Sequence, residues 1–129
     1  RLGDEHWVDG GQHRYLVLPA GSRALRLLQL YLRDNNVVCT AWPGTAWEFG
    51  LRFDRDTVLE TVEAALLRFL EQPIDPVALV RRGLDEQYRP QGKHIEYLPA
   101  LLQYRAYAAA NLDVEGAKAA VRELMAARV

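Results

Sequence analysis

The sequence predicts a single α+β domain over residues 1–129, with an N-terminal ββαββ arrangement and a mostly antiparallel sheet, followed by an all-helical half of four helices. Two observations point to this class. In the first half, Gly- and Pro-containing turns separate short runs rich in aromatic and β-branched residues, which is typical of hairpins. In the second half, apolar residues recur at helical spacing between Asp and Pro boundary signals.

Composition narrows the class of protein. A chain of 129 residues, half of them hydrophobic, can bury a core without disulfides or a structural metal. The net charge of -1 shows no basic excess of the kind that phosphate binding requires, so we expect no nucleic-acid partner. No apolar run is long enough to span a bilayer, and a single cysteine favours a reducing compartment. We therefore expect a cytoplasmic protein with no membrane partner.

The first hairpin is marked by Asp9-Gly10-Gly11, because both Asp-Gly and Gly-Gly tolerate the positive φ of tight turns. Two registers are open. If the first two residues form the turn, His6 lies opposite His13, and this pair with Asp9 could hold a metal. If the last two form it, Trp7 lies opposite Arg14, with the guanidinium over the indole. We expect no metal, because such sites usually need further protein ligands.

A helix from Arg23 to about Arg33 is predicted next, with Ser22 as its N-cap and Asp34-Asn35-Asn36 at its end. Residues 37–42 and 47–53 then form the second hairpin around the Pro- and Gly-containing turn 43–46. A four-residue loop gives the following pairs: Trp42 with Trp47, Thr40 with Phe49, and Val38 with Leu51.

The alternation after Trp42 predicts which face of the second hairpin is buried. The apolar face carries Trp47, Phe49, Leu51 and Phe53. In this register, the opposite face carries small or polar residues: Val37, Cys39, Ala41, Glu48, Gly50 and Arg52. Small residues on a sheet either let a helix pack closely or leave a shallow groove, which Glu48 and Arg52 would border. We expect the first helix to pack there.

The four helices of the second half have clear boundary signals. They run from Asp54 or Asp56 to about Glu71, from Asp75-Pro76 to about Gln87, from about Leu98 to Asn111, and from Asp113 to about Ala127. Their apolar faces and that of the first helix place the following residues in the core: Leu28, Val62, Leu66, Phe69, Leu101 and Val121.

The pattern of reactive residues predicts neither a catalytic centre nor a cofactor. Catalysis needs groups within mutual hydrogen-bond reach, and the three histidines fall in two unrelated regions. Cys39 lies within an apolar run and resembles a small buried hydrophobe rather than a thiolate. The alternative is a small enzyme or ligand-binding domain that uses Glu48 and Arg52 or the loop around His94.

Aromatic and arginine side chains at predicted edges favour binding to another protein, because such residues anchor interfaces. The candidate partner-binding residues are Trp7, Arg14, Arg23, Arg26, Trp42 and Tyr88. We therefore expect a non-enzymatic protein-binding domain of a bacterial type, for example an immunity protein that neutralises a toxin or an adaptor. Homo-oligomerisation is compatible with this class and with the enzyme alternative.

Overall fold

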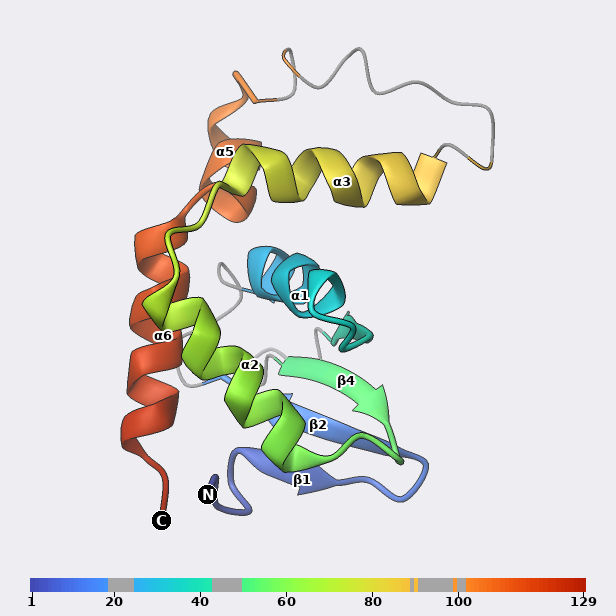
Figure 1. The fold of residues 1–129 in the computed structure, drawn as a ribbon, viewed down its shortest axis with the longest axis vertical. Coiled ribbons are helices and arrows are strands. Elements are labelled where there is room, and N and C mark those ends of the chain that lie inside the picture. The colour runs from blue at the N-terminus through green and yellow to red at the C-terminus, as the bar shows by residue number, and fades with distance from the viewer. Residues whose placement is uncertain (19–24, 43–49, 89, 91–98, 100–101) are drawn as a thin grey trace.

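A computed structural model describes residues 1–18, 25–42, 50–88, 90, 99 and 102–129 of the chain (Figure 1). Its elements are β1 (Trp7–Asp9), β2 (His13–Val17), α1 (Leu25–Asp34), β3 (Cys39–Trp42), β4 (Gly50–Asp54), α2 (Leu59–Glu71), α3 (Pro76–Tyr88), α5 (Arg105–Asn111) and α6 (Val114–Ala126). The strands form one antiparallel sheet in the order β1-β2-β4-β3, and helices α2 to α6 follow it. This arrangement confirms the predicted α+β class.

The first hairpin adopts neither predicted register. Its pairs are Trp7 with Leu16, Val8 with Tyr15 and Asp9 with Arg14. The turn lies one residue further along than the second alternative, at Gly11-Gln12, where Gly11 has φ +84. The Asp9 side chain accepts a 2.8 Å hydrogen bond from the Gly11 N–H, which holds this turn in place. The His6–His13 and Trp7–Arg14 pairings were therefore both wrong.

The second hairpin also differs from its predicted register. The observed pairs are Cys39 with Phe53, Thr40 with Arg52, Ala41 with Leu51 and Trp42 with Gly50. Cys39 therefore shares the buried face with Phe53, whereas Val38 is 70% exposed. The predicted assignment of residues 37–41 to the two faces of the sheet was therefore wrong. Of the predicted apolar face, Leu51 and Phe53 are confirmed as buried, while Trp47 and Phe49 lie outside the described residues.

The connection from α1 to β3 gives the physical reason for this difference. Asn36 ends the helix with φ 63, a left-handed conformation that Asn adopts more readily than most residues. The Val37 N–H then donates back to the Leu32 carbonyl at 2.8 Å. This tight return buries Val37 and turns Val38 outward. Two adjacent valines do not reveal from sequence which of them points inward.

Helix α1 is the centre of the core. It contacts β3 and β4 on one side, α3 on another, and also α2, α5 and α6. Figure 1 shows it between the sheet and α3. Six of its ten residues are buried, as expected for a helix surrounded by other elements: Leu25, Leu27, Leu28, Leu30, Tyr31 and Leu32. The first helix does pack on the sheet, as expected, but on the face that carries Leu51 and Phe53.

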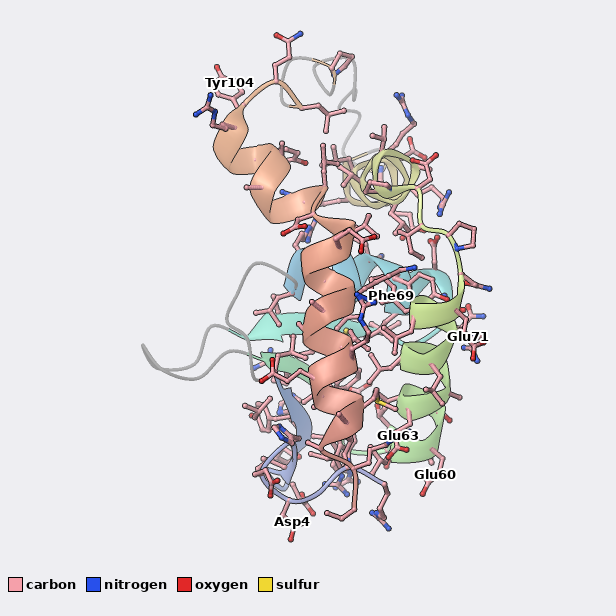
Figure 2. The ribbon with its side chains drawn as sticks, turned by 90° about the vertical axis from the view of Figure 1, so that its left-hand side faces the viewer. Asp4, Glu60, Glu63, Phe69, Glu71 and Tyr104 are labelled. Carbon is pink, nitrogen blue, oxygen red and sulfur yellow. The ribbon has the colours of Figure 1, made fainter. Side chains whose placement is uncertain are left out.

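The predicted helical core is largely confirmed. Leu28, Val62, Leu66, Phe69 and Val121 are fully buried. Phe69 points from α2 into the core in Figure 2, and its ring meets that of Tyr31 at 5.0 Å between centroids. Leu101 lies outside the described residues. No helix in the described part of the chain is long and apolar enough to cross a membrane.

Of the four predicted helix caps, two are confirmed, one is wrong, and Ser22 lies outside the described residues. Asp75 accepts a hydrogen bond from the Ala78 N–H at 3.1 Å, and Asp113 accepts one from the Gly116 N–H at 2.8 Å. Helix α2 instead begins after Val58, which provides no side-chain cap. Helix α5 begins at Arg105 after Tyr104, whose backbone is extended, while residues 98, 100 and 101 at the predicted start lie outside the described residues. At the ends of the chain, the backbones of Arg1 and Val129 bond to each other at 2.7 and 2.8 Å.

Candidate functional site

The outer face of the sheet is not covered by any of the described helices. The described helices all lie on the opposite side of the sheet (Figure 1). That inner side is fully buried at Leu16, Leu51 and Phe53, each at most 1% exposed. Because neighbouring residues on a strand point to opposite faces, the residues between these three point outward.

One row of outward residues crosses all four strands. Tyr15 pairs with Val8 on one side and with Arg52 on the other, and Arg52 in turn pairs with Thr40. We call these four residues the sheet row. Arg52 and Thr40 are exposed, and Val8 and Tyr15 are half-buried. The sheet row therefore places an aliphatic, an aromatic, a cationic and a hydroxyl side chain next to one another on a rigid support.

The neighbouring row is polar. His13 pairs with Asp54, and the His13 and Tyr15 rings lie 6.3 Å apart between centroids. His13 and Asp54 border a hollow of about 110 Å³ together with Thr40 and Arg52. Pockets for small molecules usually have volumes of roughly 300–1,000 Å³, so this hollow is too small for one. Glu48 and His94, the other residues of the enzyme alternative, lie outside the described residues.

Trp7 and Arg14 lie close together, although not as a cross-strand pair. Trp7 lies on the inner face and packs on Phe53, with 5.4 Å between ring centroids. Arg14 forms an ion pair with Asp9, the residue it faces across the hairpin. Both side chains line a depression of about 440 Å³ near the start of the chain. Since Trp7 is half-buried against the core, its side chain stabilises the fold through its contact with Phe53.

Whether the remaining predicted partner-binding residues form one surface stays a prediction, because the structure describes the side chain of only one of them. Arg26 is half-buried on α1. For Trp42 and Tyr88 the structure places the backbone at the ends of β3 and α3, without describing the side chains. Arg23 lies outside the described residues.

A second polar depression, of about 350 Å³, lies between α1, α3 and the segment before α3. Its polar groups pair with one another. The Tyr31 hydroxyl donates to Gln72 Oε1 at 2.6 Å, and Arg82 forms an ion pair with Asp34. Burial raises the pKa of the Tyr31 hydroxyl. These contacts join helices and leave few groups to receive a ligand.

The single thiol is unsuited to nucleophilic chemistry. Burial raises the pKa of Cys39 to about 12, so the group stays protonated near neutral pH. Within the described residues, no cluster of His, Cys, Asp or Glu side chains has the arrangement of a metal site.

No protein-family model matches this chain, and neither a curated protein nor a solved structure shows significant similarity to it. The sheet row was missed at the sequence level except for Arg52. The signal that could have found it is the alternation of Tyr15 and Arg52 with the buried Leu16 and Leu51. Their adjacency, however, depends on the pairing of β2 with β4, which are far apart in the sequence.

Proposed function

We propose that this chain is a non-enzymatic protein-binding domain and that the outer sheet face is its recognition surface. The main support for this proposal is the sheet row, whose four residues lie side by side across four strands: Val8, Tyr15, Arg52 and Thr40. Tyr and Arg are enriched at the energetic centres of protein interfaces. An immunity protein or an adaptor would use such a surface.

The support beneath the row favours recognition without rearrangement. Leu16 and Leu51 are fully buried directly behind the outer face, which fixes the backbone that carries the outward side chains. A surface that is ordered before binding loses little conformational entropy when the partner arrives. The backbone of the sheet row is therefore ordered before binding, and the conformational entropy that it loses on binding is small.

The shape of the surface favours a macromolecule over a metabolite. The hollow beside Arg52 has a volume of only about 110 Å³ and cannot enclose a typical small ligand. A protein partner requires no enclosure, because its own side chains complete the interface. The exposed side chains of Arg52 and Thr40 on the outer face fit that requirement.

Partner capture followed by affinity measurement tests the proposal. A partner is first isolated from the source cell with the full chain as bait, and its dissociation constant is measured by calorimetry. Arg52→Glu and Thr40→Arg change exposed positions and are expected to weaken binding tenfold or more without lowering the thermal midpoint. Arg122→Glu, on the distant helix α6, is the matched control and should bind normally.

The opposite results are equally specific. A partner that binds Arg52→Glu and Thr40→Arg as tightly as the original chain would exclude the outer face. A catalytic turnover that disappears in Arg52→Glu would instead support the enzyme alternative and overturn the proposal.

A further inference from the structure

We propose that an acidic, valine-lined groove at the end of the sheet receives a protruding apolar side chain flanked by basic residues on the partner protein. This groove lies beside the outer face. The inference specifies the partner chemistry of the proposed function, on which it rests. It lies between the α1–β3 connection, the end of β4 and the first turn of α2. Its main lining residues are Asn36, Val38, Asp54, Asp56, Val58 and Thr61.

The groove is large enough for one side chain and its neighbours. Its volume is about 370 Å³, within the range of sites that hold small ligands. Val38 and Val58 line it and are 70% and 54% exposed. They are two of only five large hydrophobic residues that are exposed in the described part of the chain. Two such residues in one groove form a local apolar surface that water covers poorly.

Val58 is a poor choice for the stability of the fold. It occupies the N-cap position of α2 and makes no side-chain hydrogen bond there. Ser, Thr, Asp and Asn are preferred at this position, because their side chains satisfy a free N–H of the first turn, and Val ranks among the worst. The side chain is also too exposed to add much to the core. A contact with a partner accounts for both features.

The charges around the groove favour a cationic partner. Asp54 and Asp56 line it, and Glu60 is exposed in the first turn of α2, where Figure 2 shows it pointing away from the protein. Two cations lie nearby: Arg55 is 3.9 Å from Asp56, and Arg52 borders a hollow together with Val38 and Asp54. The three carboxylates still carry more charge than the two guanidinium groups and the partial positive charge of about +0.5 at the start of α2 together. Basic residues flanking the inserted side chain would therefore be attracted.

Strand addition by a second copy is the main competing occupant. β3 is the edge strand next to the groove, and an open edge can pair with another chain. The side-chain amide of Gln29, however, already donates to the Cys39 carbonyl at 2.9 Å. An incoming strand would have to displace this bond. Insertion of a side chain between Val38 and Val58 requires no such displacement.

The experiment uses the full chain and three fluorescein-labelled hexapeptides. The first has one leucine between two lysines, the second replaces the lysines by glutamates, and the third replaces the leucine by serine. Fluorescence anisotropy should show the first peptide binding at least tenfold more tightly than the other two. Raising the salt concentration should weaken binding of the first peptide, because salt screens the attraction between lysine and carboxylate.

Two substitutions separate recognition from folding. Val38→Ser and Val58→Thr should each weaken binding of the first peptide about fivefold, because each removes apolar contact area. Val58→Thr should at the same time raise the thermal midpoint, since threonine can cap α2. Asp56→Lys should also weaken binding. Leu67→Ser and Glu123→Lys, which alter exposed residues outside the groove, are the matched controls and should bind normally.

Each other outcome overturns the inference. Equal binding of the glutamate peptide would remove the charge argument, and unchanged binding by Val38→Ser and Val58→Thr would remove the groove. A dimer in sedimentation equilibrium that Val38→Ser dissociates would identify a second copy as the occupant. If a captured partner depends on Arg52 but not on Val38 or Val58, the inference fails while the proposed function stands. If no partner depends on any of these residues, both fail.

Discussion

The side-chain amide of Gln29 on α1 donates a hydrogen bond of 2.9 Å to the backbone carbonyl of Cys39 on β3. Because β3 is an edge strand among the described strands, none of these strands pairs with the backbone groups on its outer side. The central helix of the core thus occupies one of these groups with its own side chain. The same bond ties α1 to the sheet at the point where Cys39 enters the buried face.

Replacing Gln29 by Ala should therefore have two effects. The free energy of unfolding should fall by about 1 kcal/mol, because a partly buried hydrogen bond is lost. Self-association should increase as well, because the edge carbonyl becomes available to another chain. Urea denaturation and light scattering measure the two effects. Gln12→Ala, in the exposed turn of the first hairpin, is the control and should change neither. A less stable but strictly monomeric variant would show that the bond does not protect the edge.

Gly83 allows α3 to approach α1 closely. A Cβ atom at this position would lie 2.5 Å from Leu30 Cδ2, and Leu30 is only 5% exposed. In a free helix, Gly83→Ala would be worth about 1 kcal/mol of added stability. Here we expect a net loss of about 1 kcal/mol, because the buried leucine must move.

A double-mutant cycle tests this explanation of Gly83. Leu30→Ala alone should cost about 2–5 kcal/mol through the cavity that it leaves. In that background, Gly83→Ala should become stabilising, because the new methyl group enters free space. Additive effects in chemical denaturation would show that the two residues do not compete for the same volume.

Lys118 connects the end of one helix to the side of another. From α6, its ammonium group donates to the Gln72 carbonyl at 2.6 Å and to the Leu70 carbonyl at 3.4 Å. These carbonyls lie at the C-terminal end of α2, where a cation also favours the helix dipole. Lys118→Met keeps the aliphatic stem and should lower the free energy of unfolding by about 1–2 kcal/mol. Arg122→Met, an exposed cation on the same helix, should have little effect in the same urea titration.

The buried thiol of Cys39 should make stability fall in alkaline solution. The pKa of this thiol is about 12 in the fold, against an ordinary value of 9.0. Between these values the unfolded chain releases a proton that the folded chain retains, so the free energy of unfolding decreases as the pH rises. The slope from one such group reaches at most about 1.4 kcal/mol per pH unit.

Denaturation midpoints measured from pH 7 to pH 10.5 test the effect of Cys39. Cys39→Ala should flatten the decline above pH 9, and the stability that remains should depend less on pH. Tyr31→Phe is a necessary comparison, because burial also raises the pKa of Tyr31 and acts in the same direction. If Cys39→Ala leaves the slope unchanged, the thiol is more accessible than its burial implies.

The sequence was sufficient wherever one residue type determines one local structure. Asp75 before a proline and Asp113 after a tight connection cap their helices as predicted, because each interaction spans only three residues. The buried positions of α2 and α6, such as Phe69 and Val121, followed from helical spacing alone. Helix α2 is the exception, because Val58 occupies its N-cap position, whereas the sequence predicted Asp54 or Asp56 there.

Registers and the candidate site could not be predicted, because both depend on pairing between distant segments. Val38 and Cys39 are both apolar, and only the conformation of Asn36 determines which of them faces the core. The sheet row likewise requires Tyr15 on β2 to pair with Arg52 on β4, and α1 separates these two strands in the sequence. Of the predicted partner-binding residues, Trp7 packs on Phe53 and Arg14 forms an ion pair with Asp9, and neither contact could be predicted before the registers were known.

The position of β4 between β2 and β3 sets the order in which the sheet can fold. Each hairpin joins neighbouring segments, so both can form and dissolve quickly. The pairing of His13–Val17 with Gly50–Asp54 must wait until α1 has brought the two hairpins together. Formation of this central seam should therefore limit the rate of folding. Substitutions at Leu16 and Leu51, which pair across it, should slow refolding more than substitutions in α6, which lies outside the sheet.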